Sequence, residues 1–128
     1  MKYGIKTANT ILYCTRWEET VSFYRDVLGL RINFSNDWFT EFLATDTSRI
    51  SIADENRASV KSCGGGGITL ALEADDIEAS HRATKEAGAV PSHIKEHPWG
   101  ARVFYVYDPE GHRVEIWQAK SAQSARAE

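Results

Sequence analysis

The 128-residue sequence predicts an α+β fold in which two βαβββ modules form one curved, eight-stranded mixed sheet. A strand–helix–strand–strand–strand order of elements occurs twice, with a period of roughly 60 residues. The glycine run Gly64–Gly67 separates the two occurrences and indicates a linker. The expected division is an N-terminal extension (1–8), a first module (9–60), a Gly-rich linker (61–67), a second module (68–118) and a flexible tail (119–128).

The first module begins with an alternating, β-branched run over residues 9–14, which is typical of a strand. A helix is indicated next by side chains that recur at helical spacing, namely Trp17, Val21, Tyr24 and Leu28. Thr15 can cap this helix, and Gly29 can end it. Three short strands are expected at 30–34, 38–44 and 49–53, with turns at 36–37 and 46–48.

The second module repeats this order, beginning with a strand at 68–72. A helix follows over 75–88, where Asp75 or Asp76 can cap the start and Gly88 can end it. A short strand is expected at 89–93. The clearest pair of strands in the chain covers 103–107 and 112–118.

The turn Asp108-Pro109-Glu110-Gly111-His112 joins this pair, because Pro109 presets φ and Gly111 can adopt the positive φ that closes a turn. A simple hairpin places Tyr107 opposite Arg113. One face then carries the apolar side chains Phe104, Val106, Val114 and Ile116. The other face carries Val103, Tyr105, Tyr107, Arg113, Glu115 and Trp117. This mixed face is either a binding surface or a solvated outer face.

Composition excludes several functional classes. The formal net charge is −3, and lysines and arginines are scattered, which argues against nucleic-acid binding. No apolar run is long enough to span a bilayer, and the first ten residues lack a signal-peptide core, so a cytoplasmic protein without membrane association is expected. Cys14 ends a strand-like run and is expected to be a buried thiol, with no disulfide framework in the chain.

Two segments carry a family resemblance: SFYRDVLGL at 22–30 and WGARVFYVYDPEGHRVEIWQ at 99–118. Together with the order of elements, they resemble the glyoxalase/bleomycin-resistance/dioxygenase (vicinal oxygen chelate) superfamily. The resemblance covers residues 9–118. It implies the glyoxalase/bleomycin-resistance/dihydroxybiphenyl-dioxygenase fold with a ligand-binding cup. It does not select a reaction, because members include lyases, dioxygenases, epimerases and non-catalytic antibiotic-binding proteins.

The resemblance also implies four metal-ligand positions, which fall on Asn9, Ser51, Gly67 and Glu115. Only Glu115 matches the family's ligands. An amide, a hydroxyl and a glycine beside one carboxylate are too few strong donors for Zn²⁺, Ni²⁺ or Fe²⁺. No cofactor is therefore expected. A divalent metal would need replacement ligands, for which His93, His97 and Cys63 are the candidates.

The remaining candidate residues concern ligand binding, and no catalytic residue is indicated. Glu115 either pairs with Arg113, Arg49 or Arg102, or recognises a cationic ligand. Trp99 resembles a pocket-lining residue of the antibiotic-binding branch, and His112 is expected to be a solvated turn residue. The predicted ligand-binding residues are Glu115, Trp99, Trp117, Tyr105, Tyr107, Trp38, Asn9, Ser51 and Arg113.

These observations favour a non-catalytic protein that binds or sequesters a planar, basic small molecule in an aromatic-lined cup. One alternative is a metal-dependent lyase or isomerase of the glyoxalase I type, or an extradiol dioxygenase, with displaced ligands. Another alternative is a metabolite-sensing module. The expected partners are the small-molecule ligand and a second copy of the chain in a homodimer.

Overall fold

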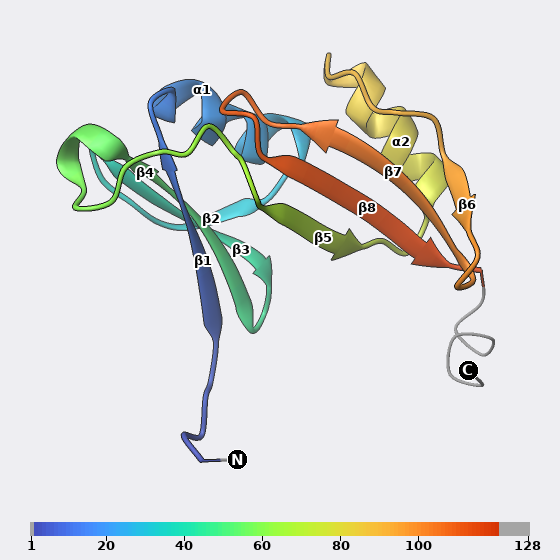
Figure 1. Ribbon diagram of the computed structural model, residues 1–128, viewed down its shortest axis with the longest axis horizontal. Coiled ribbons are helices and arrows are strands. Elements are labelled where there is room, and N and C mark those ends of the chain that lie inside the picture. The colour runs from blue at the N-terminus through green and yellow to red at the C-terminus, as the bar shows by residue number, and fades with distance from the viewer. Residues whose placement is uncertain (1, 121–128) are drawn as a thin grey trace. The chain divides into compact units, whose positions relative to one another are not determined.

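The computed structural model describes residues 2–120 and divides between Gly65 and Gly66 into two compact units, called here the first and second modules (Figure 1). The predicted α+β class and the two βαβββ modules are confirmed. The eight strands are hydrogen-bonded as two mixed sheets of four. Each sheet carries one parallel strand pair, β1 with β4 and β5 with β8, and two antiparallel pairs.

The elements of the first module are β1 (Ala8–Cys14), α1 (Trp17–Ser22), the π-helix η1 (Phe23–Val27), β2 (Arg31–Ser35), β3 (Phe39–Thr45), β4 (Ser48–Asp54) and the 3₁₀-helix η2 (Glu55–Arg57). Its sheet has the order β1-β4-β3-β2. The second module contains β5 (Thr69–Glu73), α2 (Ile77–Glu86), β6 (Lys95–His97), β7 (Ala101–Tyr107) and β8 (Arg113–Ala119), in the order β5-β8-β7-β6. The two modules therefore share one topology.

The predicted helix of the first module is two segments. The α-helical part begins at Trp17 after the N-cap residue Arg16, whose side chain makes no capping bond, so the prediction of Thr15 as the cap is wrong. From Phe23 the backbone widens, and the Leu28 N–H donates to the Phe23 carbonyl five residues earlier. Phe23 and Tyr24 are both buried in this segment. Gly29 ends the segment at φ +69°, as expected.

Each sheet packs one face against its own helix. In the first module Tyr24 contacts Phe42, and the Trp17 indole N–H donates to the Ile52 carbonyl. In the second module His81 of α2 meets the Phe104 ring edge-on, and Figure 1 shows α2 beside β7. The opposite side of each sheet is called here the far face. Strand alternation decides which side chains lie on it.

The second module differs from prediction around its shortest strand. The strand expected at 89–93 is absent, because Pro91 has no N–H and β6 begins only at Lys95. Ser92 still contacts the side of β7, where its N–H donates to the Tyr105 carbonyl and its hydroxyl accepts from the Tyr105 N–H. The Ser92 hydroxyl thus takes the place of a backbone carbonyl as the acceptor of one hydrogen bond from β7. Asp76 caps α2 by accepting from the Ala79 N–H, and Gly88 ends it at φ +93°.

The β7–β8 hairpin has the predicted register, with Tyr107 opposite Arg113 and Val106 opposite Val114. Gly111 adopts φ +105°. The Asp108 carboxylate accepts the backbone N–H groups of Glu110, Gly111 and His112, and the His112 Nδ1–H donates to it at 2.8 Å. The prediction of a solvated His112 is wrong: the residue is 1% exposed, and its ring is bonded to the buried Asp108 carboxylate.

Two further expectations concern the termini and the membrane. Of the predicted tail at 119–128, Ala119 is the last residue of β8, and residues 121–128 lie outside the described part of the chain. Within residues 2–120, neither α-helix has the length and apolar character required to cross a bilayer.

Among the polar groups of the second module, we expect the Asp108 carboxylate to be the one whose substitution lowers the free energy of unfolding most. Asp108→Ala leaves several buried donors without an acceptor, and we expect it to lower the free energy of unfolding by about 3 kcal/mol or more. Urea denaturation followed by circular dichroism measures this. Asp37→Ala removes a carboxylate from the exposed pair with Arg57 and should cost no more than about 0.5 kcal/mol. Equal effects of both substitutions would contradict this role of Asp108.

Candidate functional site

The far face of the second module brings together most of the predicted ligand-binding residues. On β8, Arg113, Glu115 and Trp117 point to the same side. Glu115 lies opposite Tyr105 of β7 and Ala71 of β5. This arrangement follows from the register that Asp108 fixes, and it confirms the face assignment made from the hairpin. Aromatic rings therefore flank a carboxylate on one surface.

The Glu115 carboxylate makes no hydrogen bond or ion pair with any group of residues 66–120. The three arginines considered as its partners bind elsewhere. Arg102 lies on the helix side of β7 and pairs with Glu78 of α2. The Arg113 Nε donates to the Thr69 hydroxyl at 2.9 Å, and Arg49 contacts Glu41 at 3.8 Å. Since Glu115 is only half-buried, water stabilises its charge.

An aromatic cluster lies at one end of this face. Trp99 lies in the turn between β6 and β7. The centre of its ring is 5.6 Å from that of Trp117 and 5.9 Å from that of His97. Trp99 is 51% exposed and Tyr107 at the other end is 61% exposed. Ala71, opposite Glu115 on β5, carries only a methyl group. The surface offers flat apolar contact at both ends and a negative charge between them.

The first module carries a polar network on its far face. Ser51 is buried and donates to the Asn9 side chain at 2.8 Å, and the Asn9 amide donates to Glu41 at 3.4 Å. Asn33 also donates to Glu41, at 2.6 Å, and Arg49 lies 3.8 Å from the same carboxylate. Sequence reasoning identified Asn9 and Ser51 but missed Glu41 and Asn33. The pairing of β3 with β4, which sets Glu41 opposite Ser51, is the signal that relates them.

Of the other predicted residues, only His97 lies beside one of these two faces. Trp38 is half-buried in the turn between β2 and β3, where its ring contacts Phe39. His93 and Cys63 are exposed in irregular segments, and His97 lies in β6 within the aromatic cluster.

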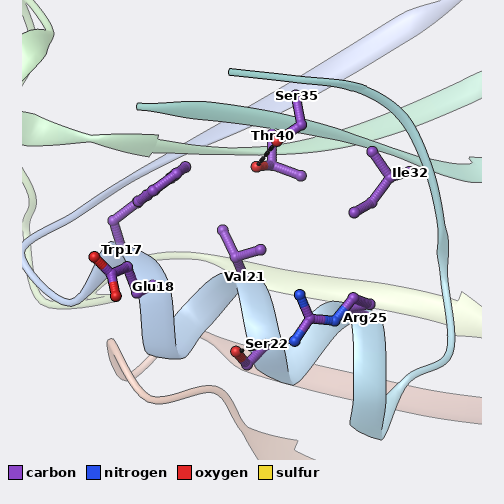
Figure 2. A pocket seen from close by; sticks show the side chains of 8 residues that line it. All are labelled: Trp17, Glu18, Val21, Ser22, Arg25, Ile32, Ser35 and Thr40. Atoms are coloured by element: carbon purple, nitrogen blue, oxygen red, sulfur yellow. Dashed lines mark hydrogen bonds between the residues drawn. The ribbon is translucent and has the colours of Figure 1, made fainter. Parts of the chain in front are cut away.

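A cavity of about 310 Å³ lies on the helix side of the first module (Figure 2), lined by Trp17, Glu18, Val21, Ser22, Arg25, Ile32, Ser35 and Thr40. Figure 2 shows Val21 of α1 pointing toward Ser35 and Thr40, whose hydroxyls bond each other at 2.8 Å. The Arg25 guanidinium binds Asp26 and lowers the pKa of that carboxyl through this hydrogen bond. Most polar groups of the cavity therefore have internal partners. None of the predicted site residues lines it.

Comparisons with known proteins agree with the fold. Residues 6–116 match the model of the Glyoxalase/Bleomycin resistance protein/Dioxygenase superfamily. Lactoylglutathione lyase from Agrobacterium tumefaciens is similar at 22% identity and a TM-score of 0.74, over 88% of this chain and 92% of that one. A protein of unknown function from Agrobacterium tumefaciens str. C58 is 26% identical, with a TM-score of 0.72 over 93% and 99% of the two chains.

An antibiotic-binding protein from Streptomyces sp. CB03234 is 18% identical, with a TM-score of 0.73 over 88% of this chain and 94% of its own. At such identities the likeness to the lyase and to the antibiotic-binding protein concerns the fold alone. No curated protein sequence matches the chain.

The residues at the family's metal-ligand positions do not fit a transition metal. Gly67 has no side chain to donate, and its φ of +78° disfavours any other residue there. The Ser51 hydroxyl donates to the Asn9 side-chain oxygen, and the Asn9 amide N–H donates to Glu41. Inside each module, the described residues contain no group of three or more His, Cys, Asp or Glu side chains placed to hold a metal ion. Glu115 alone has the required chemistry.

We expect protein purified without chelator to contain no stoichiometric zinc, nickel or iron, because one carboxylate cannot replace the missing imidazole and thiolate ligands. Elemental analysis by mass spectrometry measures this directly. The same preparation should show no metal-dependent turnover of the methylglyoxal–glutathione adduct. About one metal ion per chain that is lost in Glu115→Ala would contradict the prediction and favour a relocated ligand set.

Proposed function

The chain belongs to the glyoxalase/bleomycin resistance protein/dioxygenase superfamily, and on this premise we propose that it binds and sequesters a planar, basic small molecule without transforming it. The ligand site is the far face of the second module. Glu115, Tyr105, Tyr107, Trp117 and Trp99 contact the ligand. The protein acts in the cytoplasm and needs no cofactor.

The observation that carries this proposal is the Glu115 carboxylate, which has no hydrogen-bond or ion-pair partner within residues 66–120 and lies between aromatic side chains. A carboxylate beside exposed rings attracts an amine or another cation more strongly than a neutral molecule. The rings at both ends of the face provide stacking surfaces, each contributing roughly 0.5–1.5 kcal/mol beyond the burial of area. Antibiotic binding by a structural relative is consistent with this chemistry.

The metal-dependent alternatives receive less support. A glyoxalase I-type or extradiol reaction would require a donor set that Asn9, Ser51 and Gly67 do not supply. A metabolite-sensing role would use the same ligand site. It would differ from sequestration only in that ligand binding would regulate another process. The proposal therefore depends on ligand chemistry and not on the presence of turnover.

Bleomycin, which joins a planar ring system to a cationic group, is the test ligand for the site. We expect it to quench tryptophan fluorescence in a saturable manner, and Trp99→Ala and Glu115→Gln each to weaken binding several-fold or more. Glu86→Gln, the same carboxylate-to-amide change at an exposed position of α2, is the matched control and should leave affinity unchanged. Unchanged affinity in both Trp99→Ala and Glu115→Gln would place the ligand elsewhere and refute this site.

We also propose that the protein is a homodimer. Strand β2 is an edge of its sheet, and its Ile32 and Phe34 side chains are 43% and 53% exposed. An apolar edge strand of this kind favours coverage by a partner, and a twofold dimer covers both copies at once. Light scattering at tens of micromolar should give twice the chain mass of 14.4 kDa. A mass near that of one chain would refute the dimer.

A further inference from the structure

Arg113 and Glu115 carry opposite charges two residues apart on the far face of β8, yet they are not paired with each other. The guanidinium is held by two other groups. Its Nε donates to the Thr69 hydroxyl at 2.9 Å, and its Cζ lies 4.5 Å from the centre of the Tyr105 ring. Thr69 lies directly opposite Arg113 on β5, so the strand register sets up this contact.

These contacts fix the guanidinium but use only one of its N–H groups. Within residues 66–120 the terminal N–H groups of Arg113 have no hydrogen-bond acceptor or carboxylate partner. A planar guanidinium stacked on a ring retains its fork of parallel donors, which matches the two oxygens of a carboxylate. Because its orientation is already fixed, little side-chain entropy is lost when an anion binds.

We infer that Arg113 binds an anionic group of the ligand, so that the ligand is a zwitterion with its cation on Glu115 and its carboxylate on Arg113. This inference rests on the proposed function, since Glu115 and the neighbouring rings form the other half of the site. Side chains at positions i and i+2 of one strand start roughly 7 Å apart. A compact molecule such as an aromatic amino acid can therefore contact both charges at once.

The pair also gives the site selectivity. A purely cationic ligand on Glu115 lies close to the Arg113 guanidinium and is repelled by it, whereas a zwitterion neutralises both groups. A purely anionic ligand meets the corresponding repulsion from Glu115. The bleomycin test depends on Glu115 and the rings, and it does not require Arg113 to bind an anion.

Three indole probes separate these possibilities: L-tryptophan carries both charges, tryptamine only the cation and indole-3-propionate only the anion. Isothermal titration calorimetry measures their binding without relying on protein fluorescence. We expect L-tryptophan to bind about tenfold more tightly than either singly charged probe. Arg113→Gln should abolish that advantage, by weakening L-tryptophan about tenfold while leaving tryptamine unchanged or tighter.

Two further variants distinguish ligand recognition from a purely structural role. Arg113→Lys keeps the charge but loses the fork, so it should restore part of the L-tryptophan affinity. Arg82→Gln removes one arginine from an exposed position of α2 and should change none of the three affinities. If Arg113 only tied β8 to β5 through Thr69, Arg113→Gln would instead lower the unfolding midpoint and weaken all three probes alike, which would overturn the inference.

The outcome also separates this inference from the proposal on which it rests. Tryptamine binding as tightly as L-tryptophan, or no binding of L-tryptophan, would overturn the role of Arg113. Glu115-dependent binding of bleomycin would then leave the proposed function intact. Loss of the Glu115 dependence with bleomycin as well would reject both.

Discussion

The Asp108 carboxylate sets the geometry on which the second module depends. By accepting three consecutive backbone N–H groups and the His112 ring N–H, it determines where β7 ends and β8 begins. A shift of one residue would move every side chain of β8 to the opposite face. Glu115 would then point into the apolar layer against α2, and Val114 would take its place on the far face. The chemistry of the site is therefore a consequence of one turn.

The two modules share a topology, but the charged side chains on their far faces differ in whether they are paired within the module. In the first module Glu41 receives hydrogen bonds from Asn9 and Asn33 and lies 3.8 Å from Arg49, so its charge is compensated within the module. In the second module the acidic Glu115 and the basic Arg113 remain apart. Compensated charges contribute to the structure of a sheet, whereas uncompensated ones are available to a ligand. The acidic charge on the far face of the first module is thus compensated within that module, whereas the charges on the far face of the second module are not paired with each other.

Local signals allowed much of this fold to be predicted. Turn chemistry at Pro109 and Gly111 and strand alternation identified the hairpin and the residues on its two faces. Alternation alone would also have excluded Arg102 as a partner of Glu115, because Arg102 lies opposite Gln118 on the helix side.

What could not be predicted depends on tertiary packing. The π-helical turn at 23–27, which contains the buried Phe23 and Tyr24, has no signature in local helix propensity. His112 looked solvated because a turn histidine usually is, but its burial follows from a carboxylate four residues earlier. In the sequence, Glu41 is a single acidic residue in a predicted strand, and no local pattern indicates its partners. Its partners lie on the three other strands of the sheet, β1, β2 and β4.

The half-exposed position of Glu115 explains how an unpaired charge is tolerated and how it selects a ligand. Without ligand, water solvates the carboxylate, so leaving it unpaired costs little. A neutral planar molecule that stacked on Tyr105 and Trp117 would displace that water. It would offer the carboxylate no hydrogen bond or ion pair in its place. Burying an unpaired charge in this way opposes the gain from stacking. A ligand with a cationic group replaces the lost water by an ion pair, and the same rings then favour its binding. Selectivity thus arises because Glu115 has no partner among the described residues of the second module, where Thr69 and Tyr105 hold the Arg113 guanidinium.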